Sequence, residues 1–218
     1  MYDVGPVLHP SSELRYVNPS IGYGVFATRF IPKGTITWVF DDLDQVVSAE
    51  RVARLLPMMR EAVDKYSYLN GRGQRILCWD HARFVNHSCH PTSLAPGFDL
   101  EIAIRDIQQG EEITDDYGSL NLETEFVCAC GSELCRGIIR PGDFDRYGAR
   151  WDLLVADAFP LINRVEQPLW DLVADKTEIM KVLAGEAELP SCRTHFLGAA
   201  PGDARETCQR SSTTGTPA

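Results

Sequence analysis

The sequence predicts a mainly β fold with some α-helix, with small sheets in the first two thirds and helices near the carboxyl end. Residues 14–40 and 75–105 contain short stretches of alternating apolar and polar residues separated by glycine and proline, which is typical of short strands. Residues 145–158 and 165–184 instead repeat apolar side chains at helical spacing. With 218 residues and 44% hydrophobic content, we expect one compact domain with appendages.

The elements follow in order along the chain. The first strands are expected at residues 14–17, 22–27 and 35–40, with a turn at residues 31–34. Residues 48–65 change to helical spacing, and Ser48 is the expected N-cap. Pro57 is expected to interrupt or kink this helix. The expected apolar stripe comprises Val52, Leu55, Leu56, Met59 and Val63. Further strands are expected at residues 75–79, 100–105 and 111–117.

The carboxyl-terminal part reads as helices followed by a tail. The apolar stripes of residues 145–158 and 165–184 favour docking onto the β core over a cofactor site; they comprise Trp151, Leu154, Val155, Leu169, Leu172, Val173 and Met180. Residues 188–218 form the last segment, and its end is rich in glycine, alanine, serine, threonine and proline. We expect this tail to be disordered.

The charge of the chain limits the possible partners. A net charge of −10 and a pI near 4.9 argue against direct, sequence-independent binding of nucleic acid and favour a basic partner. Residues 1–10 lack the features of a secretory signal, and no run approaches the roughly 20 apolar residues of a membrane span. We therefore expect a soluble, cytoplasmic protein without membrane contact.

Cysteines give the sharpest functional signal. Cys89 follows an Asn86-His87 pair, and residues 128–137 (CACGSELCRG) supply Cys128, Cys130 and Cys135. Seven cysteines are an odd number, and cysteines of an intracellular chain stay reduced, so metal binding is favoured over disulfides. Four thiolates form a closed, structural zinc site. His90 competes with Cys89 for the fourth position, and Cys78, Cys192 and Cys208 are expected to be ordinary thiols.

Four ordered signatures carry a resemblance to a known family; they are residues 22–27 (GYGVFA) with 31–34 (IPKG), 83–91 (RFVNHSCHP), 110–118 (GEEITDDYG), and the cysteine module that ends at Gly137. Together they span about residues 12–140, and the sequence resembles a SET-domain protein-lysine methyltransferase with a post-SET zinc module. The resemblance implies a β-clip fold of small sheets in which the Asn-His segment and the chain end form a pseudoknot.

The resemblance also implies a domain plan. The SET domain would cover residues 12–118, the post-SET zinc module residues 124–140, and a helical extension residues 143–187, before the tail. The first cysteine is Cys78, so the cysteine-rich module that often precedes the SET domain is absent from this sequence. Such a compact form looks like bacterial members of the family.

S-adenosylmethionine is the methyl donor that the resemblance implies, together with one structural zinc ion. By motif match, the methionine part of the donor would be contacted by Ile21, Gly22 and Tyr23. Its adenosyl part would be held by Asn86 and His87. Tyr66 would also contact the donor, and Arg136 would contact its adenine. The same match makes Cys89 the fourth zinc ligand, beside Cys128, Cys130 and Cys135.

Tyr117 is the expected catalytic residue. A lysine amine, with a pKa near 10.4, must lose a proton before it attacks the methyl group, and the reaction then depends mostly on alignment. The Tyr117 hydroxyl can orient the amine and sense the charge that develops beside the methyl group. The acidic residues Asp41, Asp42, Asp44, Glu111 and Glu112 form either a solvated face or a groove for a basic, lysine-containing peptide.

The sequence departs from the family pattern at four places. At one of them, Asp115 replaces the aromatic residue that usually stands two residues before the tyrosine. The others are residues 40–43 (FDDL), residues 79–80 and Thr92. Asp115 occupies a position that helps to set the number of methyl groups added, so that number does not follow from the resemblance. These departures leave two alternatives open. One is a non-catalytic module that binds a basic peptide, and the other is methylation of a small amine.

Overall fold

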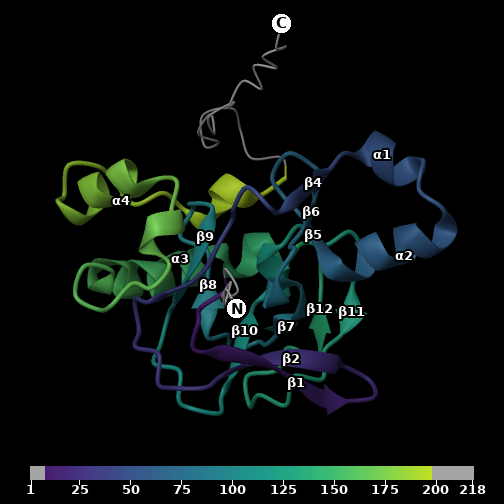
Figure 1. The fold of residues 1–218 in the computed structure, drawn as a ribbon, viewed down its shortest axis with the longest axis horizontal. Helices are drawn as coiled ribbons and strands as arrows, with labels where there is room; N and C mark the ends of the chain where they lie inside the picture. The colour runs from purple at the N-terminus through teal and green to yellow at the C-terminus, as the bar shows by residue number, and fades with distance from the viewer. Residues whose placement is uncertain (1–7, 198–218) are drawn as a thin grey trace, which may run out of the picture.

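The computed structural model describes residues 8–197, in which the strands form four small sheets (Figure 1). The largest has the order β1 (Ser12–Asn18), β2 (Gly22–Ala27), β10 (Glu112–Asp115), β7 (Asn86–His87). A second has the order β3 (Ile36–Val39), β9 (Leu100–Ala103), β8 (Ser93–Leu94). The third comprises β4 (Gln45–Val47), β6 (Arg75–Leu77) and β5 (Ser67–Leu69), and the fourth is the hairpin of β11 (Phe126–Val127) and β12 (Ile138–Ile139). The expectation of small sheets is confirmed.

Strand β7 is the feature that assembles the central sheet. It pairs in parallel with β10, with Thr114 opposite Asn86 and Asp115 opposite His87. The Ser88 N–H extends the pairing by donating to the Asp115 carbonyl at 2.9 Å. The Asn-His segment and the GEEITDDYG segment therefore lie side by side, as the expected pseudoknot requires.

The helix expected at residues 48–65 forms as two helices, α1 (Ala49–Ala53) and α2 (Pro57–Tyr66). The Ser48 side chain caps α1 by accepting the Arg51 N–H, and Pro57 begins α2, where its missing N–H costs nothing. The expected apolar stripe is wrong for most of its length, because within α2 Val63 alone is buried. Figure 1 shows α1 and α2 at one edge of the molecule, where only one side of a helix meets other elements.

The helix expected at residues 145–158 is confirmed as α3 (Asp143–Ala158), but the one expected at residues 165–184 is shorter. Only α4 (Lys176–Leu183) forms as an α-helix in that stretch, preceded by a 3₁₀ turn at Trp170–Leu172. Val173 is extended, with ψ of 125°, and this conformation ends the turn before α4 begins. Among residues 8–197, no helix combines the length and the apolar character that crossing a bilayer demands.

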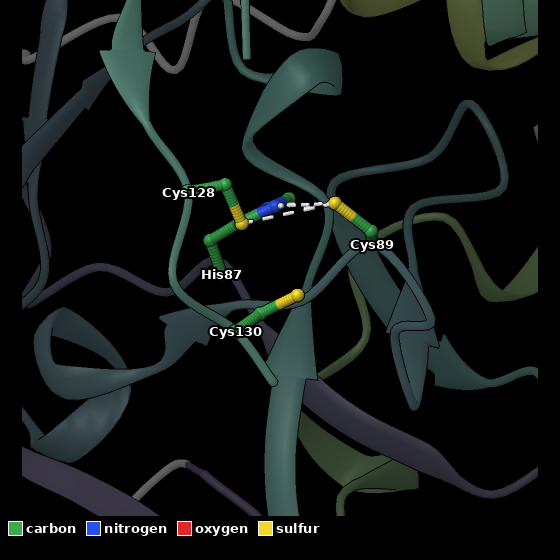
Figure 2. A group of neighbouring side chains, drawn as sticks. All are labelled: His87, Cys89, Cys128 and Cys130. Atoms are coloured by element: carbon green, nitrogen blue, oxygen red, sulfur yellow. Dashed lines mark hydrogen bonds between the residues drawn. The ribbon is translucent and has the colours of Figure 1, made fainter. Parts of the chain in front are cut away.

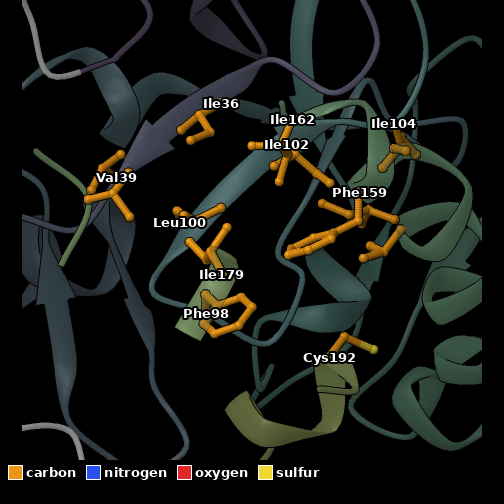
Figure 3. Packing of buried hydrophobic residues seen from close by; sticks show 14 of the residues in the cluster. Ile36, Val39, Phe98, Leu100, Ile102, Ile104, Phe159, Ile162, Ile179 and Cys192 are labelled. Atoms are coloured by element: carbon orange, nitrogen blue, oxygen red, sulfur yellow. The ribbon is translucent and has the colours of Figure 1, made fainter. Parts of the chain in front are cut away.

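Helix α3 and the turn after it pack onto the β3-β9-β8 sheet and form the main core (Figure 3). Trp151, Val155 and Phe159 are buried there; they meet sheet residues that include Ile36 and Ile102. The docking role expected of the helical stripes is thus confirmed for α3. Gln167 fixes the extension further, because its side-chain amide donates to the Gly34 carbonyl at 2.8 Å and accepts the Ile36 N–H at 2.8 Å.

The expectation of a disordered tail is wrong for residues 188–197. Cys192–His195 form a 3₁₀ turn in which Cys192 is buried, and the Phe196 ring stacks on Phe144 with centroids 4.4 Å apart. The burial of apolar side chains offsets the entropy cost of ordering this segment. Residues 198–218, which complete the expected tail and include Cys208, lie outside the described residues.

Candidate functional site

The opening glycine motif and the Asn-His segment meet at one point. The Asn86 side-chain amide donates to the Tyr23 carbonyl at 3.0 Å and to the Glu112 carboxylate at 2.7 Å. A Cβ atom at Gly24 would lie 2.1 Å from the Glu112 carboxylate and 2.9 Å from the Asn86 amide. A side chain at position 24 would therefore displace the ends of the Glu112 and Asn86 side chains and disturb the hydrogen bond between them.

The surface beside this contact is open and apolar. Ile21 and Tyr23 are exposed, and a Cβ atom at Gly22, whose φ is +88°, would meet nothing within 4 Å. The Phe84 ring stands next to those of Tyr23 and Tyr66, with centroids 6.1 Å and 5.6 Å away. The open space beside the Gly22 backbone can accept a ligand, and the neighbouring aromatic rings offer it an apolar surface. The surface therefore fits a cofactor that contains a flat, partly apolar ring system.

Tyr117 lies two residues after the end of β10, where a short 3₁₀ turn begins. Its backbone N–H donates to His87 Nδ1 at 3.1 Å, and its hydroxyl donates to the Val85 carbonyl at 2.6 Å. The ring packs beside His87 and Phe126, with centroids 5.6 Å and 6.1 Å away. Burial, reinforced by Asp115 and Glu101 nearby, raises the pKa of Tyr117, so the phenol keeps its proton at neutral pH.

Tyr117 also lines a cavity of about 560 Å³. Of the predicted site residues, Tyr66 and Tyr117 line it, whereas Ile21, Gly22, Tyr23, Asn86, His87 and Arg136 are not among its walls. Tyr117 therefore lines the cavity and also contacts the Asn-His segment through its backbone N–H. Acidic side chains on the cavity walls are Asp64, Asp99, Glu101, Asp115 and Glu123.

The acidic residues singled out from the sequence lie elsewhere. Asp44 is buried and accepts the N–H groups of Asp41 and Trp79, each at 3.2 Å. The Trp79 indole N–H donates to Asp41 at 3.0 Å, and Glu112 binds Asn86. None of Asp41, Asp42, Asp44, Glu111 and Glu112 is among the residues that line the cavity.

Arg136 points its charge at two buried carboxyl groups. Its guanidinium forms an ion pair with Asp116 and a second, at 3.5 Å, with Asp143, and it lies 4.6 Å from the centre of the Tyr147 ring. Asp116 also accepts the Trp151 indole N–H at 3.2 Å. Within residues 8–197, Arg136 Nε is buried without a hydrogen-bond partner. The guanidinium thus holds Asp116, next to Tyr117, and its expected contact with adenine stays a prediction.

Three of the predicted metal ligands gather in one cluster (Figure 2). The sulfurs of Cys89, Cys128 and Cys130 and a ring nitrogen of His87 all lie within 4.8 Å of one another. The Cys89 and Cys128 sulfurs are 3.8 Å apart. A tetrahedral ion with Zn–S bonds of about 2.3 Å separates its sulfurs by about 3.8 Å, so the cluster could hold a metal ion of this type.

Cys135 and His87 compete for the fourth position. The Cys135 thiol contacts the sulfurs of Cys128 and Cys130 and lies 3.7 Å from the Cys128 carbonyl, although it is outside the four-residue cluster. His87 Nδ1 accepts the Tyr117 N–H, so a neutral ring carries its proton on Nε2. This Nε2 lies 3.3 Å from the Cys89 sulfur, where it donates a hydrogen bond. Burial lowers the pKa of His87 to about 4, which keeps the ring neutral. His90 is exposed and outside the cluster.

The comparisons with known proteins identify the fold around these groups. The SET domain family matches residues 22–118, a range that contains the glycine motif, the Asn-His segment and Tyr117. Residues 22–118 are a SET domain. Its first predicted strand, β1, lies before the matched range but pairs with β2 along most of its length.

Several curated proteins share this SET domain. The "Variant-silencing SET domain-containing protein" of Plasmodium falciparum is 29% identical over 130 residues, which is 52% of this chain and 5% of that protein. The "Putative histone-lysine N-methyltransferase 1" of the same organism is 29% identical over 152 residues, 60% of this chain and 2% of that protein. Human "Histone-lysine N-methyltransferase SETD1B" is 41% identical over 69 residues, 28% of this chain and 4% of that protein. The chain therefore spans only a small part of these relatives.

Among solved structures, the methyltransferase domain of human "Histone-lysine N-methyltransferase SETMAR" is 20% identical, with a TM-score of 0.44. The likeness covers 61% of this chain and 58% of that one.

Sequence reasoning missed Glu101, which lies in the SET domain on β9. Alternation along the strand marks Glu101 as a solvent-facing residue between the buried Leu100 and Ile102. In the structure Glu101 instead lines the cavity, and its carboxyl group shares a hydrogen bond with that of Asp115. Burial raises the pKa of Glu101 to about 7 and that of Asp115 further above its usual range. No local sequence signal distinguishes a cavity from open solvent.

Proposed function

We propose that this protein transfers a methyl group from S-adenosylmethionine to the side-chain amine of a lysine in a protein substrate. The observation that carries the proposal is the position of Tyr117, which lines the cavity and also hydrogen-bonds to His87 beside the open surface at Gly22. Relatives that share the SET domain and are named histone-lysine methyltransferases support the same activity.

The donor would bind on the Gly22 side of Tyr117. S-adenosylmethionine, when bound, supplies a methyl group on a positively charged sulfur. The open backbone at residues 21–23 would hold its methionine part, while Asn86 and His87 would hold its adenosyl part. Tyr66 borders this region through Phe84. Arg136 would act indirectly: its ion pair with Asp116 would fix the position of the neighbouring Tyr117, the proposed catalytic residue.

The substrate lysine would enter through the cavity. The Tyr117 hydroxyl donates its proton to the Val85 carbonyl, so a lone pair on its oxygen remains to accept an amine N–H. This contact directs the amine nitrogen toward the methyl group, and alignment of this kind supplies much of the rate of a group transfer. Because Tyr117 stays protonated at neutral pH, it orients the amine and does not act as a base. The lysine ammonium would lose its proton to solvent before attack, and the new N–C bond would form as the S–C bond breaks, which leaves S-adenosylhomocysteine.

One zinc ion would be held by Cys89, Cys128, Cys130 and Cys135. His87 would donate its Nε2 proton to the Cys89 thiolate, as groups around metal sites commonly do. The ion would join the Asn-His segment to the β11–β12 hairpin, and with four protein ligands it would be structural.

On the cavity wall, Asp64 and Glu123 pair with Arg75. Glu101 and Asp115 form no ion pair with an arginine or lysine of the described residues, so these two carboxyl groups favour a cationic group such as the substrate lysine. Core histones are the first substrates to test, because relatives carry that substrate in their names.

The test is methyl transfer from isotopically labelled S-adenosylmethionine to core histones and to the proteins of a cell lysate, read by mass spectrometry. We expect labelled lysine with the wild type and at least about 100-fold less with Tyr117→Phe, a loss typical of one transition-state hydrogen bond. Tyr16→Phe, which removes the hydroxyl of an exposed tyrosine on β1, is the matched control.

Calorimetry with S-adenosylmethionine separates binding from transfer. Both tyrosine variants should bind the donor as the wild type does. A wild type that binds the donor but labels no protein would instead favour a non-catalytic binding module, and label on small amines alone would contradict a protein substrate.

A further inference from the structure

Asp115 and Glu101 form an acidic pair on the wall of the cavity that Tyr117 also lines. Asp115 comes from β10, two residues before Tyr117, and is 3% exposed; Glu101 comes from β9. Their side chains hydrogen-bond to each other, and both line the cavity. Two carboxylates cannot hydrogen-bond to each other without a proton, so the pair holds at least one proton and carries at most one negative charge.

The pair has no cation of its own. Among the described residues, no arginine, lysine or histidine forms an ion pair with either group, whereas the buried Asp116 and Asp143 share Arg136. Asp115 has one further contact, in which a carboxyl oxygen accepts the Asp116 N–H at 2.6 Å. A buried acidic pair that serves only the fold is costly without a cationic partner, and well-packed apolar residues are commonly as stable.

We propose that the Asp115–Glu101 pair binds the substrate amine by accepting hydrogen bonds from its N–H groups next to Tyr117. This inference rests on the proposed function and deepens it, because it names the groups that recognise the amine. The geometry supplies complementary chemistry: a cationic or neutral lysine amine brings N–H donors, and the pair brings acceptor oxygens and negative charge to the wall of the same cavity.

This arrangement discriminates between methylation states. Each methyl group on the amine replaces an N–H donor with a carbon, which leaves a carboxyl oxygen of the pair without a partner. An unpaired buried acceptor disfavours binding far more than a small change in apolar volume does. The pair therefore selects the unmethylated amine over the monomethylated one, and over the dimethylated one more strongly still, so transfer beyond monomethyllysine is disfavoured.

The test uses the peptide around the lysine that the lysate experiment identifies, synthesised with that lysine unmodified, monomethylated or dimethylated. In each single variant, Asp115→Asn or Glu101→Gln, the new amide can donate a hydrogen bond to the carboxylate that remains, so the negative charge is kept. The double variant removes the charge. We expect each single variant to stay within about threefold of the wild-type KM for the unmodified peptide. The double variant should raise that KM at least about tenfold and lose at least about tenfold of the preference for the unmodified over the dimethylated peptide.

Asp99→Asn is the matched control, because Asp99 is another acidic residue on the cavity wall and pairs with His195. It should change neither the KM nor the preference. Binding of S-adenosylmethionine, measured by calorimetry, should be equal in all variants, and this shows that the amide substitutions leave the fold and the donor site intact.

The outcomes distinguish the two proposals. If the wild type methylates lysine but the double variant keeps the wild-type KM and methyl-state preference, the pair does not bind the amine and the proposed function stands. An equal rise in KM with Asp99→Asn also overturns the role of the pair, because any acidic wall residue would then suffice. If the wild type binds the donor and methylates no lysine, both proposals fail.

Discussion

Asp44 is buried on the loop before β4, where its carboxyl group accepts two backbone N–H groups. Burial raises the pKa of Asp44 to about 6, and the charges of Asp41 and Asp80 add to the rise. A folded-state pKa above the unfolded value of about 3.9 means that folding favours the protonated form. The contribution of Asp44 to stability is therefore greatest below about pH 4 and is lost as the pH rises through 6.

Asp44→Asn should reduce the pH dependence of stability, because an amide does not titrate. We expect the melting temperature of the wild type to fall relative to that of the variant as the pH is raised from 4.5 to 7.5. Thermal unfolding at the two pH values measures this difference, and Asp42→Asn, an exposed neighbour on the same loop, is the control. An unchanged difference between wild type and Asp44→Asn across this range would contradict the assignment.

Among the elements, the β11–β12 hairpin has the least support of its own. Each strand has two residues, and one hydrogen bond beyond them joins the Cys128 N–H to the Gly137 carbonyl at 2.8 Å. Hairpins of this size are marginal in isolation. Its apolar contacts are few and centre on the buried Ile139. A metal ion held by the cysteines would supply the cross-link that the hairpin otherwise lacks.

Metal content tests this element directly. We expect about one zinc ion per chain in the purified protein by elemental analysis, and less than about one fifth of that in Cys128→Ser, because a three-ligand site binds zinc far more weakly. Chelation should increase amide hydrogen exchange across residues 126–139 and leave the β3-β9-β8 sheet protected. Cys192→Ser, a buried cysteine of the main core, is the control and should retain the metal.

The choice of fourth ligand is settled by the same measurement. Cys135→Ser should lose zinc as Cys128→Ser does, whereas His87→Gln should retain it. The opposite pattern would make His87 the ligand and would require the tautomer inferred from the Tyr117 hydrogen bond to be wrong.

At the scale of the whole molecule, residues 188–197 close the fold around the cavity. Cys192 and His195 line it, and the Asn121 side chain donates to the carbonyls of Leu69 and His195 at 3.0 Å and 2.7 Å. Asn121 also accepts the Leu197 N–H at 2.7 Å. The carboxyl-terminal segment is thus part of the cavity wall, although it follows the SET domain by some 70 residues.

Shortening the chain separates this segment from the rest of the tail. A chain that ends at residue 187 should melt about 6–12 °C below the full chain, because it loses the burial of Cys192 and the stacking of Phe196 on Phe144. A chain that ends at residue 197 should melt within about 2 °C of the full chain. Equal melting temperatures for the two shortened chains would show that residues 188–197 add nothing to stability.

Much of the fold follows from local patterns in the sequence. The strands at residues 22–27 and 100–103, the cap at Ser48 and helix α3 were all expected, because alternation, capping and helical spacing act over a few residues. The stretch at residues 165–184 was misjudged because its apolar spacing fits a helix, while the extended backbone at Val173 depends on tertiary packing.

The site was predictable where a motif fixes it. Tyr117, Asn86 and the cysteines were singled out because their spacing carries a family signature. The structure joins Tyr117 to His87 and gathers Cys89, Cys128 and Cys130, while the roles of these residues stay predictions. Glu101 was missed because its contact with Asp115 joins two strands that are not neighbours in one sheet. Arg136 was singled out from the sequence, but its ion pairs with Asp116 and Asp143 were not predicted, because tertiary structure alone fixes them.

Arg136 also sets a condition on how this protein can diverge in evolution. Its guanidinium is the shared cation of Asp116 and Asp143, which are each at most 2% exposed. Loss of Arg136 alone would leave two buried carboxylates without a counter-ion. Loss of either aspartate alone would leave the guanidinium with one carboxylate partner in place of two. Substitutions at these three positions should therefore be inherited together among close relatives, although position 136 lies in the cysteine module and position 143 at the start of α3.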